Sequence, residues 1–342
     1  MRRNTAANEE IHMADVPITI VSGDYDRIQA IKSGAVAVEG CDVTYLNLSP
    51  GETFFRLFNY QEFDVSEMSF STYMLARSKG DWPYRAVPVF LSRVFPHCSI
   101  YIRSDRGIER PEHLHGRIVG VPSYHFTRGL AVRGMLHDEY GVAPSDMRWR
   151  IGGVDRPEDF DYVGVDAPDG VEVVPIDRRR CLSELLLEGE IDAIVSYRDP
   201  QILSDGAPDI VRLFPDFRAA ERAYFAKTGI FPIMHLLGIH ERLLERYPWI
   251  ARSIVKAFEE AKACCLPRLT DLDALSVTLP WLVAETRETM ALMGEDFWPY
   301  GVARNVPTLE AQTRWSFEHG LSIRRFTPED LFVESTLAWY HT

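Results

Sequence analysis

The chain has 342 residues, 46% of them hydrophobic and 25% charged, which is typical of a globular protein with more than one lobe. Its formal net charge of −13 argues against nucleic-acid binding, because phosphate contacts need a basic surface. The sequence contains neither an apolar run of about 20 residues nor the apolar core of a signal peptide. We therefore expect a soluble cytoplasmic protein that makes no contact with a membrane.

Short apolar runs alternate with helical patterns from residue 17 onward, which predicts α/β architecture. Strands are expected at 18–22, 41–48, 63–68, 86–92, 99–103, 118–121, 147–151, 171–176 and 191–195. Helices are expected at 27–33, from residue 50, at 71–79 and at 125–140, and a surface loop at 155–170. Beyond residue 230 the pattern is mainly helical, at 241–246, 248–266, 271–293, 308–320 and 328–339. We expect this helical tail to pack back on the first lobe.

Cysteine and glycine patterns give no sign of a common cofactor site. The five cysteines are odd in number and show no C-x-x-C spacing, which disfavours a disulfide framework and a cysteine zinc site. The glycines form neither a Walker loop nor a Gly-x-Gly-x-x-Gly motif, so nucleotide binding has no support. Reduced thiols of a cytoplasmic protein are the simplest interpretation.

Polar clusters follow apolar, strand-like runs at five places. They are residues 22–27 (SGDYDR), 67–69 (EMS), 93–99, 123–127 and 196–198 (SYR). Ligands of open α/β sheets bind just beyond the carboxyl ends of the strands. The shared position of the five clusters therefore predicts one common cleft.

The first two clusters contain carboxylates, and each carboxylate has a functional and a structural interpretation. Asp24 and Asp26 either approach a ligand or cap the following helix, and Asp24 is the better functional candidate. Arg27 either contacts a ligand carboxylate or pairs with Asp26. Glu67 is costly to bury without a partner, so it has either a functional role or an ion pair to Arg27 or Arg93.

The later clusters offer hydrogen-bond donors and a helix start. Ser69 is either a ligand donor or the N-cap of the helix at 71–79. Ser123, Tyr124 and Thr127 lie where helix 125–140 begins, and free N–H groups there attract an anion. Capping of that helix is the alternative for Ser123 and Thr127. Arg198 follows the strand at 191–195 and is a candidate carboxylate clamp.

Eight motifs stand out along the chain: SGDYDR (22–27), FDVSEMSFSTY (63–73), PVFLSRVFPHCSIY (88–101), GVPSY (120–124), YGVAPSDMRWR (140–150), LFPDF (213–217), TGIFPIMH (228–235) and MGEDFWPYGV (293–302). In these motifs and their spacing, the chain resembles the 4,5-dihydroxyphthalate decarboxylase family over nearly its whole length from about residue 17.

The resemblance implies a two-lobe type II periplasmic-binding-protein-like α/β fold with a helical C-terminal region. Two crossover strands, near 93–99 and 229–236, would join the lobes. Lobe 1 would comprise 1–95 and 235–342, lobe 2 would comprise 96–234, and the site would lie in the cleft between them.

The resemblance also implies a carboxy-lyase of aromatic catabolism, which converts 4,5-dihydroxyphthalate to protocatechuate and CO2 in phthalate degradation. Such a reaction needs an acid for the ring carbon, a group that polarises a phenol, and cations for the carboxylates. His97 or His235, one at each crossover, is the expected acid. Arg93 and Arg198 are expected to hold carboxylates.

Several expectations remain open at this point. Asp24 or Glu67 is expected to polarise the phenol, with no cofactor; a divalent metal held by these carboxylates, His97 and His235 is the alternative. The expected partners are a small aromatic carboxylate and further copies of the chain, as a dimer or tetramer. The rival functions are a cytoplasmic small-anion sensor without catalysis and a decarboxylase of another hydroxybenzoate.

Overall fold

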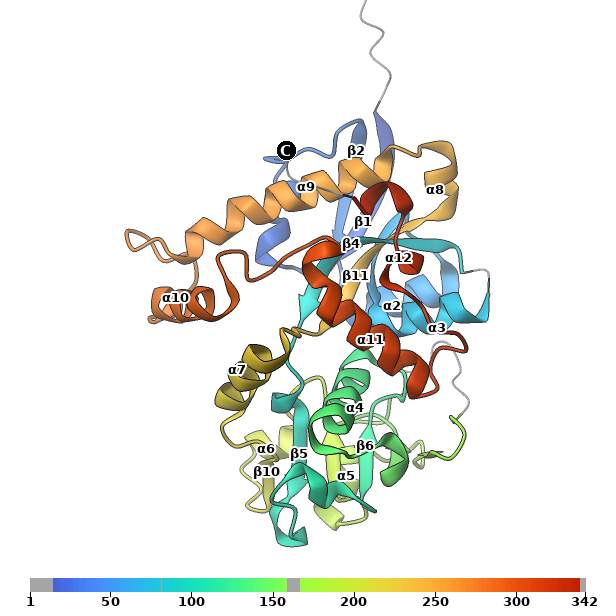
Figure 1. Cartoon of the computed structure of the whole chain (residues 1–342), viewed down its shortest axis with the longest axis vertical. Coiled ribbons are helices and arrows are strands. Elements are labelled where there is room, and N and C mark those ends of the chain that lie inside the picture. Colours follow the sequence, from blue (N-terminus) through green and yellow to red (C-terminus); the bar gives the residue numbers. More distant parts are fainter. Residues whose placement is uncertain (1–14, 81, 159–166, 339–342) are drawn as a thin grey trace, which may run out of the picture.

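The structure is a computed structural model that describes residues 15–80, 82–158 and 167–338 (Figure 1). Residues 1–14, on which the expectation about a signal peptide depends, are outside the described residues. Residues 159–166 of the predicted surface loop are outside them as well. Two β-sheets form the framework, one in the upper half of Figure 1 and one in the lower half.

The first sheet, sheet A, has five strands in the order β2-β1-β3-β11-β4. Strand β1 pairs in parallel with β2 and β3, whereas β11 is antiparallel to both β3 and β4. Sheet A is therefore mixed. Its strands are β1 (Val16–Ser22), β2 (Cys41–Asn47), β3 (Val65–Ser69), β4 (Tyr84–Arg93) and β11 (Ile233–His240).

The second sheet, sheet B, has six strands in the order β10-β5-β9-β6-β7-β8. Strands β9, β6, β7 and β8 are parallel, and β5 is antiparallel to its two neighbours. The strands are β5 (Ile100–Arg103), β6 (Ile118–Val121), β7 (Arg148–Ile151), β8 (Glu172–Pro175), β9 (Ala193–Val195) and β10 (Ile210–Arg212).

The chain passes between the sheets twice. It leaves sheet A after Arg93 and enters sheet B at Ile100, and it returns after β10 through α7 (Phe217–Thr228) to β11. The two passages touch: Val94 N donates to Pro232 O at 3.3 Å, and the rings of Phe95 and Phe231 stack at 4.6 Å. The assignment of 1–95 with 235–342 to one lobe and 96–234 to the other stays a prediction.

Helices cover the sheets. Around sheet A lie α1 (Gln29–Lys32), α2 (Pro50–Tyr60), α3 (Phe70–Lys79), α8 (Glu241–Arg246), α9 (Ile250–Cys265) and α12 (Pro328–Leu331). The lower half contains α4 (Thr127–Tyr140), α5 (Leu182–Glu188) and α6 (Gln201–Ser204). Helices α10 (Leu282–Met293) and α11 (Val306–Glu318) lie between α9 and α12 in the chain. None of the helices in the described ranges is both long enough and apolar enough to cross a bilayer.

Helix α11 contacts both halves of the molecule. The sequence predicted only that the helical tail packs on the first lobe. Trp315 is fully buried, and its indole Nε1 donates to Asp138 on α4 at 2.8 Å. Gly134 faces the same indole, where a Cβ atom would lie 2.1 Å from a ring carbon. A glycine on α4 therefore allows α11 to approach the sheet B half closely.

In the C-terminal half, two expected helices are shorter than predicted, and a strand and a helix occur that were not predicted. The expected helix 271–293 begins only at Leu282, because residues 271–281 form turns that end near Pro280. The expected helix 328–339 is short, ending at Leu331. Strand β10 and helix α7 were not predicted, although Asp216 caps α7 by accepting from Ala219 N at 3.0 Å. That N-cap was a usable sequence signal.

Candidate active site

A cavity of about 530 Å³ lies between the two sheets and is lined by residues of both. Four of the five predicted polar clusters contribute residues to the lining of this cavity. The cluster at 93–99 contributes none, although the preceding residue, Ser92, lines the cavity. The lining comprises Tyr25, Ser49, Pro50, Gly51, Phe54, Phe58, Ser69, Thr72, Ser92, Pro122, Ser123, His125, Phe126, Thr127, Arg128, Arg156, Glu158, Tyr197, Arg198, Met234 and His235. Its volume is that of a small-ligand pocket.

A buried carboxylate and a histidine form the chemical centre of this cavity. Glu67 on β3 is fully buried, and its Oε1 lies 2.6 Å from Nδ1 of His235 on β11. The same Oε1 accepts from the Tyr25 hydroxyl at 2.6 Å, and Oε2 accepts from Gly23 N at 2.8 Å. The predicted ion pair to Arg27 or Arg93 is therefore replaced by His235 and Tyr25.

The surroundings of Glu67 favour its charged form. Burial alone raises the pKa of this carboxyl, but the hydrogen bond and charge of His235, with the donors Tyr25 and Gly23, outweigh burial and hold the pKa below its usual value. Burial, followed by the charge of Glu67, raises the pKa of Tyr25, so its phenol keeps the proton that it donates. Glu67 is thus a fixed anion behind His235.

The ring of His235 faces the cavity. Its Nδ1 is used by Glu67, so Nε2 is the nitrogen that can reach a bound molecule. The ring of Phe54 meets the imidazole edge-on at a centroid distance of 4.9 Å. Phe54 is held there by α2, which Ser49 caps by accepting from Glu52 N at 3.3 Å.

Hydroxyl groups connect the two halves at the cavity wall. Thr127 Oγ1 accepts from Ser71 N at 3.1 Å and lies 3.0 Å from Ser69 Oγ. Thr72 Oγ1 lies 3.1 Å from His125 Nδ1. Neither Ser69 nor Thr127 caps its own helix with its side chain. Thr127 instead accepts from a backbone N–H in the first turn of α3, across the cavity wall.

Three arginines line the cavity from the sheet B half. Arg198 pairs with Asp155 at 3.4 Å, and Arg156 pairs with Glu158. Arg128, in the first turn of α4, was not singled out from the sequence. Of the predicted site residues, Arg198, Ser123, Ser69, Thr127 and His235 line this cavity, and Glu67 contacts His235 from behind.

Three other predicted site residues lie outside the lining. Asp24 is exposed and pairs with Lys32 at 2.6 Å. The guanidinium of Arg27 pairs with Asp26 at 2.9 Å, the structural alternative considered above, and stacks on the Tyr25 ring at 4.4 Å. The ring of Tyr124 is buried under the guanidinium of Arg133. Their predicted roles have no support from their placement.

His97 lies in the passage between the sheets but does not line the cavity. It is buried between the rings of Phe214, at 4.9 Å, and Tyr224, at 5.3 Å. Burial lowers the pKa of His97 to about 4. A neutral histidine in an aromatic contact is suited to packing, and His235 is therefore the better candidate for the acid.

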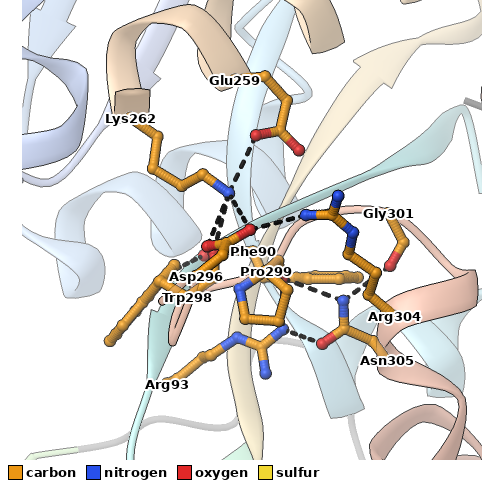
Figure 2. Close-up of polar contacts among 10 residues, drawn as sticks. All are labelled: Phe90, Arg93, Glu259, Lys262, Asp296, Trp298, Pro299, Gly301, Arg304 and Asn305. Atoms are coloured by element: carbon orange, nitrogen blue, oxygen red, sulfur yellow. Dashed lines mark hydrogen bonds and ion pairs between the residues drawn. The ribbon is translucent and has the colours of Figure 1, made fainter. Parts of the chain in front are cut away.

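Arg93 does not line the cavity, and its guanidinium lies in a buried network. It donates to Phe231 O at 3.1 Å. It also donates to Asn305 Oδ1 and, at 2.9 Å, to Pro299 O, two residues drawn with it in Figure 2. Burial lowers the pKa of Arg93 to about 9. These contacts tie the end of β4 to the chain segment before α11, which is a structural role.

The same network contains a buried lysine. Lys262 on α9 lies 2.9 Å from Glu259 and 3.0 Å from Asp296, and Arg304 reaches Asp296 at 2.8 Å (Figure 2). Lys262 Nζ also donates to Trp298 O at 3.2 Å. These contacts join α9 to the chain segment before α11.

The four side chains considered as metal ligands, those of Asp24, Glu67, His97 and His235, do not come together at one point. In the described ranges, no group of three His, Cys, Asp or Glu side chains is arranged to hold a metal ion. Of the four side chains named above, Glu67 and His235 are adjacent, whereas Asp24 pairs with Lys32 and His97 packs on aromatic rings.

Fold and site together define a periplasmic-binding-protein-like α/β protein with a buried carboxylate–histidine pair in its cleft. The periplasmic aliphatic sulphonate binding protein of Escherichia coli superposes with a TM-score of 0.50 at 11% identity, covering 95% of this chain and 99% of that chain. A Candida albicans protein with the generic periplasmic binding protein fold gives 0.50 at 9% identity, covering 92% and 97%. These likenesses confirm the predicted fold class.

Sequence relatives identify the family. The chain is 39% identical over 325 residues to 4,5-dihydroxyphthalate decarboxylase of Comamonas testosteroni, covering 95% of this chain and 98% of that protein. It is 36% identical over 219 residues to the Pseudomonas putida protein of the same name, covering 64% and 85%. No protein-family model matches the chain. The chain belongs to the 4,5-dihydroxyphthalate decarboxylase family, as its motifs predicted.

Proposed function

We propose that this protein is a non-oxidative decarboxylase that converts 4,5-dihydroxyphthalate to protocatechuate and CO2. The observation that carries the proposal is the 2.6 Å contact between buried Glu67 and His235 at the wall of the cavity. This pair places a proton donor, backed by a fixed negative charge, where a small ligand would bind. The two relatives with this name support the choice of substrate.

The chemistry requires protonation of the ring carbon that carries the departing carboxylate. His235 transfers its Nε2 proton to that carbon. The bond to the carboxylate then breaks, its electron pair returns to the ring, and CO2 leaves. One phenol is para to this carbon, and its electron density favours protonation. Water restores the proton on His235, so one proton is consumed and a dianion becomes a monoanion and CO2.

The other walls match an aromatic ring with hydroxyl groups. Phe54, Phe58, Phe126 and Met234 supply apolar surface, and Ser92 and Thr72 supply hydroxyls. His125 lines the cavity from the sheet B half, and its Nδ1 lies 3.1 Å from Thr72 Oγ1, which helps to position that hydroxyl. Asp24, which was expected to polarise a phenol, is exposed and paired with Lys32.

The decisive experiment compares two histidine variants. CO2 release and the ultraviolet spectrum would be followed with chelator-treated protein, with and without added divalent metal. His235→Gln should lower kcat by about 100-fold or more, because general acid catalysis contributes this much, whereas His97→Gln should retain most activity. Loss of activity in His97→Gln with full activity in His235→Gln would reverse the assignment.

The same assay separates the rival function. A protein whose melting temperature rises with 4,5-dihydroxyphthalate but that releases no CO2 under either condition would be a small-anion binding protein. Turnover only with added metal would recast His235 and Glu67 as ligands.

Location and assembly are also proposals. All five cysteines are free, which supports a reducing compartment such as the cytoplasm. A homo-oligomer is the usual form of soluble enzymes of this kind. Light scattering after gel filtration would test the dimer or tetramer directly.

A further inference from the structure

Arg128 occupies a distinctive position in the cavity. It lies in the first turn of α4, and its Nη1 donates to Tyr197 O at 3.0 Å and to Ser99 Oγ at 3.3 Å. Ser99 belongs to the passage between the sheets, and Tyr197 follows β9. Two separate segments therefore fix the guanidinium at the cavity wall.

Arg128 has no carboxylate partner among the described residues. Arg198 and Arg156, by contrast, pair with Asp155 and Glu158. Burial lowers the pKa of Arg128, so its charge is held in place at a cost that a bound anion would offset. Its Nε is buried without a hydrogen-bond partner.

One further carboxylate acts on Arg128 only at a distance. Glu221 contributes an electrostatic attraction to Arg128, but no ion pair forms, and Glu221 Oε1 accepts instead from Cys98 N at 3.1 Å. Glu221 is therefore committed to the backbone of the passage between the sheets. It does not fill the place of an anion beside Arg128.

The surrounding backbone adds to the positive potential. Strands β6 and β9 run in parallel with Val119 opposite Ala193, so their carboxyl ends lie at the same edge. Helix α4 begins beyond β6 and has 14 residues, and its N-terminus carries a partial positive charge. Ser123, between β6 and α4, is buried at the cavity wall.

We propose that Arg128, with Ser123 and the start of α4, forms a carboxylate subsite that holds the carboxylate retained in the product. This inference rests on the proposed decarboxylation. The departing carboxylate loses its charge as CO2 forms, so a strong ion pair to it would stabilise the substrate more than the transition state. A cation is better placed on the retained group, in the half of the molecule opposite His235.

Binding of product fragments tests the subsite without any turnover. Isothermal titration would compare protocatechuate, which has the carboxylate, with catechol, which lacks it. Wild-type protein should bind protocatechuate more tightly. Arg128→Gln should weaken protocatechuate binding by about 10- to 100-fold and leave catechol binding unchanged, because a hydrogen-bonded charge is lost. Arg128→Lys, which keeps the charge, should fall between the two.

The same titrations include a control variant and identify the results that would overturn the subsite. Arg150→Gln removes an arginine that pairs with Glu172 on sheet B outside the cavity, and it should bind both molecules as wild type does. Unchanged protocatechuate binding in folded Arg128→Gln would overturn the subsite, as would equal or absent binding of the two molecules by wild-type protein. Failure of the proposed function shows separately, as absence of CO2 from wild-type protein.

Discussion

His235 Nδ1 and Glu67 Oε1 lie 2.6 Å apart on neighbouring strands, although 168 positions separate them in the chain. Strand β11 brings them together because it enters sheet A between β3 and β4 after the chain has built the whole of sheet B. The return of the chain from the second half to the first therefore creates the carboxylate–histidine pair. The catalytic proposal depends on this return.

Glu67→Gln tests the charge of the pair. The amide keeps the shape but removes the anion behind His235, so we expect kcat to fall by about 100-fold or more, with a smaller change in KM. Steady-state kinetics of CO2 release would measure both. Glu62→Gln, which changes an exposed carboxylate paired with Arg56, is the matched control. Equal rates for the two variants would contradict the proposed mechanism.

His97→Gln tests a packing role through the pH dependence of stability. The pKa of His97 is about 4 in the folded protein and 6.5 in the unfolded chain, so the unfolded chain binds more protons between these values. Stability should therefore fall as the pH decreases from 6.5 to 4, by about 3 kcal/mol from this residue. Urea unfolding at several pH values should show a shallower fall for the variant. An unchanged slope would refute this explanation.

Arg93→Leu tests the structural role of the first predicted carboxylate clamp. The substitution removes the donor to Phe231 O and to Asn305 Oδ1 and one of two donors to Pro299 O, which should destabilise the protein by about 3 kcal/mol. Any folded variant should keep the wild-type KM. A variant with normal stability and a greatly raised KM would restore the substrate-binding role. Chemical denaturation and kinetics of the same preparation would distinguish the two.

Thr127→Val tests the hydroxyl contact between the two halves. Valine has nearly the same shape but cannot accept from Ser71 N, which leaves a buried donor unsatisfied at about 1–3 kcal/mol. We expect a lower melting temperature and a higher KM, because the two cavity walls are held together less firmly. Thr289→Val removes a half-buried hydroxyl that donates to Glu285 O within α10, away from the cavity, and should change neither quantity. Identical behaviour of both variants would contradict the prediction.

Much of the site was predictable because strands place polar residues at shared edges. The clusters at 22–27, 67–69, 123–127 and 196–198 all contribute to one cavity, and the family motifs identified the relatives. The aromatic wall and Arg128 were missed. Phe54 has the pattern of a core-facing helix residue, and nothing in the sequence around Arg128 marks it as different from a surface arginine.

Two residues on β4 show what the sequence left open. Ser92 lines the cavity, whereas Arg93 points into the buried network around Asn305. Successive side chains of a strand face opposite sides, so an error of one position moves a residue from the site to the framework. The sequence by itself determined the α/β architecture, the family and the strand ends that carry polar groups. Only the tertiary structure decided which side chains face the cavity, because side-chain direction and long-range partners depend on how distant segments pack.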